Sequence, residues 1–178
     1  VRLLRGGQLT TLAGTCGFGG HADGAPLDAR FQHPHHINLD PRNESELYVS
    51  DVECHDDDPF PDDQKYKPCS KTDGGVCFSG VRKIELDRTT GLATRVSTVA
   101  GQFTEKSHGK KACNKFADGD AKTASFNYVH GTAFMPLSAA ERAGPRSGGG
   151  SDAIFICDED NNRIRKIDLR TRTTTTLA

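Results

Sequence analysis

The chain has 178 residues, about the size of one ordinary domain, and its formal net charge at pH 7 is −1. A charge so near zero gives no global field that would steer the chain to nucleic acid or to a membrane surface. With 34% hydrophobic residues and no apolar run near the roughly 18 residues that cross a bilayer, we expect no membrane span in this segment.

Short segments that predict β-strands follow one another along the first half of the chain. They are rich in β-branched residues and are bounded by Gly, Asp, Asn or Pro. Residues 1–14, which end in TTLAG, predict one strand. Four more strands follow, with the sequences HINLD, ELYVSD, VRKIEL and RVSTVAG, which end at Asp40, Asp51, Leu86 and Gly101.

The same segments recur in the same order in the second half. HADGAPLDARFQHPHHINLD (21–40) parallels FADGDAKTASFNYVHGTAFM (116–135). LYVSD parallels IFICD, VRKIEL parallels IRKIDL, and the chain stops at TTTTLA, close to another copy of TTLAG. Four matching segments in one order indicate a tandem repeat. We therefore predict an all-β chain made of two units, each with four consecutive antiparallel strands.

One such unit cannot shield both of its faces, and stacking units around an axis gives a β-propeller of typically about 4 to 8 blades. The series TLAG, ADG, ARF, LYVSD, VRKIEL and VSTVAG resembles the NHL repeat, and DEDNNRIRKID (158–168) is nearly the signature core of that family. The resemblance implies a propeller, often six-bladed, with a binding role.

The repeat boundaries divide the chain into three parts. We expect residues 1–14 to be the outer strand of a preceding blade, 15–101 to be one blade and 102–178 to be a second blade. Since the chain begins and ends within a repeat, we expect the remaining blades to belong to the same parent chain.

Three insertions interrupt the repeats. Connections between successive antiparallel strands alternate between the two faces of a propeller, so the insertions at about 52–80 and 102–117 share one face. The insertion at about 137–152 lies on the opposite face, and its Gly, Ser and Pro content predicts a flexible segment. Long loops need cross-links or partners to offset their ordering entropy. We therefore expect ligand contacts on the shared face, the alternative being surface insertions without a role.

All six cysteines fall on this shared face or at its edge, and none forms a C-x-x-C pair. We expect disulfides in an oxidising compartment, and reduced thiols in a cytosolic protein are the alternative. Pairing of Cys69 with Cys77 and of Cys16 with Cys113 is compatible with the repeat. The disulfide candidates are Cys16, Cys54, Cys69, Cys77, Cys113 and Cys157.

Charged residues cluster in the two insertions of the shared face. The carboxylates suit calcium in principle, but no D-x-D-x-D-G spacing is present, so solvated side chains are the expected reading. The candidate binding residues are Asp56, Asp57, Asp58, Asp62, Asp63, Lys110 and Lys111.

Three histidines stand within the four residues HPHH (33–36). His35 aligns with His130 in the second repeat, which favours an equivalent structural role at the start of each first strand. The alternative is a channel zinc held by one histidine per blade, as in the amidating lyases, which are similar propellers. That zinc site would use His35, His130 and a third histidine. His33 and His36 flank His35 in the strand and are expected to point elsewhere.

We therefore expect a non-catalytic interaction scaffold without a cofactor, part of a secreted, cell-surface or lumenal protein that binds a protein or a glycan. A propeller enzyme with a zinc or calcium ion and a cytoplasmic scaffold are the alternatives. We do not expect nucleic acid to be the ligand, because the predicted binding face is mixed in charge and aromatic residues make up only 7% of the chain.

Overall fold

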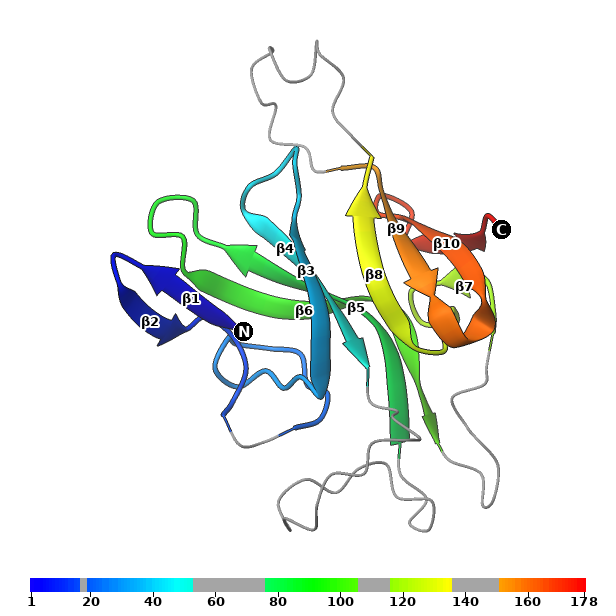
Figure 1. Ribbon diagram of the computed structural model, residues 1–178, viewed down its shortest axis with the longest axis horizontal. Helices are drawn as coiled ribbons and strands as arrows, with labels where there is room; N and C mark the ends of the chain where they lie inside the picture. Colours follow the sequence, from blue (N-terminus) through cyan, green and yellow to red (C-terminus); the bar gives the residue numbers. More distant parts are fainter. Residues whose placement is uncertain (17–18, 53–75, 106–115, 136–150) are drawn as a thin grey trace.

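The computed structural model describes residues 1–16, 19–52, 76–105, 116–135 and 151–178. These residues form antiparallel sheets, and the all-β prediction is confirmed (Figure 1). One short 3-10 turn, η1 (Glu159–Asn161), is the single helical element of the described ranges. No helix in those ranges has the length and apolar character needed to cross a membrane.

The first sheet consists of four consecutive strands in the order β3-β4-β5-β6. Each strand is antiparallel to the next, as the predicted repeat unit requires. The strands are β3 (His33–Leu39), β4 (Glu46–Val52), β5 (Val76–Leu86) and β6 (Ala93–Glu105).

The second sheet repeats this order with β8-β9-β10-β11, so LYVSD and IFICD occupy matching second strands of neighbouring sheets. A two-residue strand, β7 (Gly119–Asp120), adds to the outer edge at β11. In the first sheet, Gly24 makes an isolated bridge to Val96 at the same place. The other strands are β8 (Val129–Phe134), β9 (Ala153–Asp158), β10 (Arg163–Asp168) and β11 (Thr173–Thr176).

Residues 1–14 form two strands, β1 (Arg2–Arg5) and β2 (Gln8–Thr11), so the prediction of a single outer strand was wrong. The two residues between them explain the difference. Gly6 and Gly7 have φ angles of 55° and 78°. Two consecutive positive φ angles are typical of the two-residue turn that closes a tight β-hairpin.

Two of the predicted insertion boundaries also need correction. The expected insertion at 52–80 begins after β4 and ends before β5, because residues 76–79 already pair with residues 102–105 of β6. The same pairing moves the start of the insertion expected at 102–117 to a point beyond Glu105. The two strands therefore continue past the end of β4 as a ribbon.

The strand ends that border these insertions lie together, as predicted for a shared face. Val52 is opposite Ser79, and Val76 is opposite Glu105. The ends that border residues 136–150 lie at the other end of the sheets. There the Ser151 backbone N–H donates to Asp40 Oδ2 (2.8 Å), and the Ser151 hydroxyl donates to Asp40 Oδ1 (2.5 Å).

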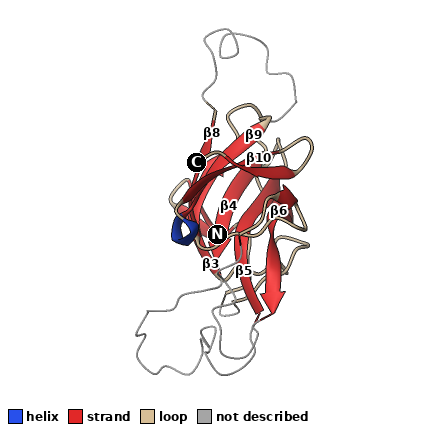
Figure 2. Cartoon of the chain, turned by 90° about the vertical axis from the view of Figure 1, so that its right-hand side faces the viewer, coloured by secondary structure: helices blue, strands red, loops and turns tan. Residues whose placement is uncertain are grey.

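The apolar core lies in two layers, one on each face of the first sheet. Tyr48, Val81 and Val99 face the second sheet, where they pack with Phe126 and with three isoleucines of β9 and β10. The opposite face of the first sheet packs against residues of the N-terminal segment. Figure 1 places the β1–β2 hairpin on one side of the first sheet and the second sheet on the other, and Figure 2 looks at the molecule from the side of the second sheet.

Candidate functional site

The first strands of the two sheets bring three rings together at one end of the molecule. The ring centroids of His35 and His130 lie 5.2 Å apart in an edge-to-face arrangement. The Tyr128 ring lies 5.4 Å from the His35 ring and 5.9 Å from the His130 ring. The two histidines are exposed and Tyr128 is partly exposed. We call these three residues the ring cluster.

A β-bulge in each first strand positions the two histidines. The register of β3 against β4 shifts between Pro34 and Ile37, and that of β8 against β9 shifts between Val129 and Thr132. Each shift inserts one extra residue, which bends the strand and redirects its side chains. His35 and His130 occupy the same place in these two bulges. The predicted structural equivalence is therefore confirmed, although both rings face solvent instead of packing inside.

The backbone of Tyr128 adopts a left-handed conformation with φ 63°. A bulky residue rarely has a positive φ, and such outliers concentrate at functional sites. The 3-10 turn η1 holds this conformation, because the Glu159 N–H donates to the Tyr128 carbonyl (3.1 Å). The Glu159 carboxylate in turn lies 3.3 Å from His130 Nδ1. An acidic group therefore borders the ring cluster.

A seam of hydrogen bonds fixes the two first strands relative to each other. The buried Ser50 hydroxyl donates to the His130 carbonyl (3.0 Å) and accepts the N–H of His36 (3.0 Å). His36 Nδ1 lies 2.9 Å from the Thr132 hydroxyl, and the Asn38 amide donates to the Thr132 carbonyl (2.6 Å). These bonds cross between the sheets and set the distance between the rings.

The histidines of the HPHH stretch point in different directions, as predicted. His33 Nδ1 lies 3.1 Å from the Val52 carbonyl, whereas His36 reaches across to the second sheet. The described residues contain no group of three or more His, Cys, Asp or Glu side chains placed to hold a metal ion. Among the described residues His35 and His130 supply two imidazoles, so a three-histidine zinc site would need its third histidine from another blade.

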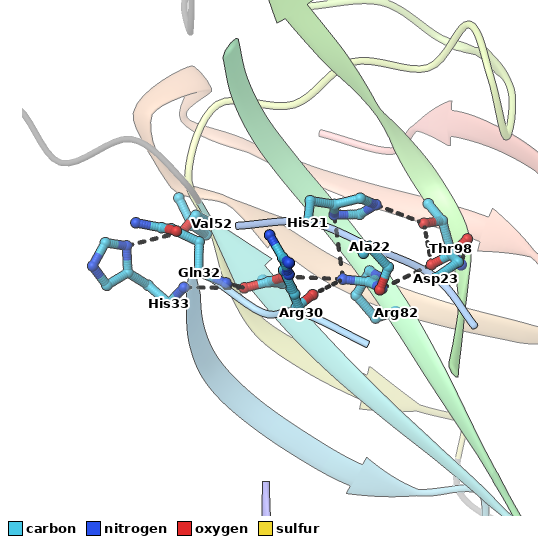
Figure 3. Close-up of polar contacts among 10 residues, drawn as sticks. His21, Ala22, Asp23, Arg30, Gln32, His33, Val52, Arg82 and Thr98 are labelled. Atoms are coloured by element: carbon cyan, nitrogen blue, oxygen red, sulfur yellow. Dashed lines mark hydrogen bonds and ion pairs between the residues drawn. The ribbon is translucent and has the colours of Figure 1, made fainter. Parts of the chain in front are cut away.

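A buried arginine repeats in the two sheets and explains the recurrence of several motifs. The Arg82 side chain is fully buried, and it forms ion pairs with Asp23 (2.7 Å) and Asp51 (3.2 Å). It also donates to the carbonyls of Ala22 (2.8 Å) and Arg30 (3.0 Å), as Figure 3 shows. Buried ion pairs need such additional hydrogen bonds to offset the loss of hydration.

Arg165 makes the same set of bonds in the second sheet. It pairs with Asp118 (2.8 Å) and with the fully buried Asp158 (2.6 Å), and it donates to the carbonyls of Ala117 and Ser125. In each sheet, the aspartate of the ADG motif and the aspartate at the end of the second strand thus pair with the same buried arginine. These networks are structural, because their arginines are shielded from solvent.

The two strand-end aspartates also accept backbone N–H groups. Asp51 Oδ1 accepts the N–H groups of Gln32 and His33, and Asp158 Oδ1 accepts that of Asn127. Burial raises the pKa of Asp51 to about 6, although Arg82 and the backbone N–H donors act in the opposite direction.

His21 belongs to the first network. Because a guanidinium has no acceptor, the Arg82 contact at 3.2 Å makes His21 Nδ1 the acceptor. The proton then lies on Nε2, which donates to the Thr98 hydroxyl (2.9 Å). Burial and the Arg82 charge lower the pKa of His21 to about 3, with Asp23 opposing them. His21 is thus a neutral structural histidine at neutral pH.

Of the other predicted site residues, the structure describes only the cysteines at positions 16, 77 and 157, and the second of these only by its backbone. Cys16 and Cys157 are exposed, and they form no disulfide with another cysteine of the described residues. The Cys77 backbone belongs to β5, but its side chain lies outside the described residues. Also outside the described ranges are Cys54, Cys69, Cys113, Asp56, Asp57, Asp58, Asp62, Asp63, Lys110 and Lys111.

Sequence reasoning found the two histidines of the ring cluster but missed Tyr128 and Glu159. No pattern marks them, since Tyr128 aligns with His33 and Glu159 follows a strand end in a short connection. The arginine networks could have been found, because the Arg-Lys pairs, the ADG motifs and the strand-end aspartates all repeat. Arg82 and Lys83 form no single basic patch, because Lys83 bonds to Glu46 and Glu85 while Arg82 is buried.

No protein-family model matches this chain, and no curated protein matches it. The NHL assignment therefore stays a prediction that rests on the repeated motifs.

Proposed function

We propose that the two sheets are blades of an NHL-type β-propeller that acts as a non-catalytic interaction module, with the ring cluster as part of its binding face. The propeller is supported by the uneven exposure of equivalent residues in the two sheets. In the first sheet, Val81 and Val99 are buried by the second sheet. Their counterparts Ile164 and Leu177 are 41% and 53% exposed.

The repeat identifies what fits the exposed face of the second sheet. The second sheet covers the equivalent face of the first sheet. A further sheet of the same repeat would therefore cover the exposed face of the second sheet. Exposed apolar patches in soluble proteins mark such contact surfaces. The parent protein is therefore proposed to supply further blades, and the segment described here would contribute two of them.

The ring cluster carries the proposed binding role. His35, Tyr128 and His130 are solvent-accessible rings on the end of the sheets that also borders the two cysteine-containing insertions. Aromatic and amphipathic rings are enriched in binding surfaces because they bury a large area at low cost in conformational entropy. The left-handed backbone of Tyr128 is the single observation that favours binding over a purely structural role, since strained backbone conformations concentrate at functional sites.

A peptide display library and a glycan array together test this proposal. Ligands selected on the protein should lose at least tenfold in affinity when Tyr128 and His130 are both replaced by alanine. Arg170→Ala, an exposed change in the turn after β10 at the other end of the sheets, is the control and should leave binding unchanged. Ligands that bind the double variant as tightly as the parent protein would contradict the assignment of the site.

Zinc binding by His35 and His130 is the second candidate, favoured by the contact between their rings. Metal analysis of the purified protein separates the two functions. One equivalent of zinc that is lost in a His35→Ala, His130→Ala variant would support the metal site over the interaction module.

The cellular location follows from the cysteines. We propose an oxidising compartment, on the basis of six cysteines in a 178-residue chain. Mass spectrometry under non-reducing conditions checks this, and six free thiols would contradict it.

A further inference from the structure

One asparagine of the chain stands in the pattern Asn-x-Ser, which is the acceptor motif for N-linked glycans. The motif consists of Asn43, Glu44 and Ser45, and its middle residue is not the proline that the motif excludes. The other five asparagines of the chain have neither serine nor threonine two residues further on. The sequence therefore offers a single acceptor motif of this kind.

The motif lies in the short connection between β3 and β4. The Glu46 N–H donates to the Asn43 carbonyl (3.0 Å), which closes a turn over residues 43–46. Glu44 is exposed, and Asn43 and Ser45 are partly exposed. A glycan is bulky and hydrated, so it is carried at the protein surface, and a turn of this kind meets that requirement.

The hydrogen bonds of the Asn43 side chain fix the orientation of its amide. Asn43 Oδ1 accepts the Ser45 hydroxyl (2.6 Å), the Ser45 N–H (3.3 Å) and the Arg88 guanidinium (3.0 Å). A backbone N–H and a guanidinium can only donate, so the amide atom that faces them is the oxygen and not the nitrogen. The amide nitrogen, Nδ2, therefore points away from these partners.

Asn43 Nδ2 is the atom that would carry the sugar, and it is available. It makes no hydrogen bond in the part of the chain that the structure describes, and it is not one of the buried atoms that lack a partner, so it reaches solvent. The amides of two other asparagines differ. Asn38 Nδ2 donates to the Thr132 carbonyl (2.6 Å), and Asn161 Nδ2 donates to Asp158 (2.9 Å). A substituent on Nδ2 would disturb those bonds but none at Asn43.

The turn lies at the end of the sheets opposite to the ring cluster. Strand β3 begins at His33, two residues before His35, and ends at Leu39, just before this connection. The next residue, Asp40, accepts from Ser151 at the same end. A glycan on Asn43 would therefore leave the ring cluster open to a ligand.

We propose that Asn43 is an N-glycosylation site that receives an oligosaccharide from a polyisoprenoid pyrophosphate carrier. In this transfer a bond forms between Asn43 Nδ2 and the anomeric carbon of the first sugar. The bond between that carbon and the pyrophosphate oxygen breaks, Nδ2 loses one proton, and the lipid pyrophosphate leaves. Asn43 Oδ1 remains a carbonyl oxygen and keeps its three hydrogen bonds. The proposal rests on the oxidising compartment proposed above, because such acceptor motifs are used in secreted proteins.

Expression of the full chain behind a secretion signal, in a eukaryotic cell line that N-glycosylates its secreted proteins, tests this site. The intact mass of the secreted and the retained protein should show one oligosaccharide, which a peptide-N-glycosidase removes. Peptide mapping should then find aspartate at position 43. Asn43→Gln and Ser45→Ala should each abolish the modification. Ser45→Thr keeps the hydroxyl and is the matched control, which should retain the glycan.

Two results would overturn the inference. The first is an unmodified Asn43 in the parent chain recovered from the secretory pathway, and the second is an oligosaccharide that Asn43→Gln retains. Counting free thiols on the same preparation separates this inference from the proposed compartment. Disulfide-bonded protein with an unmodified Asn43 would overturn the glycosylation site alone. A glycan at Asn43 on a protein with six free thiols would support the site and contradict the argument from the cysteines.

Discussion

His21 and Phe116 occupy the same position in the two repeats and contact equivalent buried arginines by different means. His21 Nδ1 lies 3.2 Å from Arg82 Nη1, whereas the Phe116 ring centroid lies 4.6 Å from Arg165 Cζ. An imidazole that accepts from a guanidinium must remain neutral, and a phenyl ring has no such requirement. One residue type thus makes the first sheet sensitive to pH at a point where the second sheet is not.

This difference predicts a pH-dependent stability for the first sheet. The pKa of His21 is lowered to about 3 in the folded protein, so below the unfolded value of 6.5 the unfolded state binds a proton that the folded state does not. The free energy of unfolding should therefore fall as the pH decreases from about 7 to about 4, by at most about 1.4 kcal/mol per pH unit, and by less because the ring is partly exposed.

The variant His21→Phe isolates this effect in urea denaturation at several pH values. It should remove the part of the acid destabilisation due to His21, and Phe116→His should add a similar dependence to the second sheet. Asp51, whose pKa is raised to about 6, makes an opposite contribution between about pH 6 and 4. That contribution is common to the parent and the variant. Parallel pH profiles for the parent protein and His21→Phe would contradict the assigned role.

The hydroxyl of Thr174 gives a second prediction. This atom is buried and has no hydrogen-bond partner among the residues that the structure describes. Val96 stands at the equivalent place in the first sheet and is fully buried. A buried hydroxyl without a partner costs about 1–3 kcal/mol, so Thr174→Val should raise the free energy of unfolding by about 1 kcal/mol. The midpoint of urea denaturation should rise at constant m-value, and Val96→Thr should lower it.

The Arg165–Asp158 pair gives a third prediction, because both side chains are fully buried. Removing one partner leaves an uncompensated charge, so Arg165→Met should cost about 3–5 kcal/mol. The double variant Arg165→Met, Asp158→Asn should recover part of this loss, since an asparagine oxygen can still accept the Asn127 N–H. A double-mutant cycle measures the coupling. A coupling energy near zero would mean that the two residues stabilise the sheet independently.

The repeat made the strand order predictable, because four motifs recur in the same order and each carries a strand-like pattern. The hairpin at Gly6–Gly7 was missed because the segment before TTLAG was assigned as a single strand, although VRLLR matches the start of VRKIEL. The insertion bounds were wrong because pairing between β5 and β6 extends past their repeat motifs. Strand pairing of this kind depends on tertiary context more than on local composition.

The candidate site was predictable only in part. Alignment of the repeats placed His35 and His130 at one height, which the structure confirms by their ring contact. It gave no sign of Tyr128, whose position depends on a left-handed backbone fixed by a turn that lies 31 residues further on. Long-range contacts of this type leave no local periodicity in the sequence.

Tyr128 provides the last prediction, which separates stability from binding. Its φ of 63° is unfavourable for a tyrosine but acceptable for an asparagine, which tolerates the left-handed region through local hydrogen bonds. Tyr128→Asn should therefore leave the free energy of unfolding unchanged within about 0.5 kcal/mol or raise it, because relief of strain offsets the lost ring contacts. The same variant should lose the ligands selected on the parent protein.

Urea denaturation and binding measured on one preparation give both readouts, with Tyr128→Phe as the control that keeps the ring. A marked loss of stability in Tyr128→Asn would show that the fold itself requires the tyrosine, and the backbone outlier would then no longer point to a binding role.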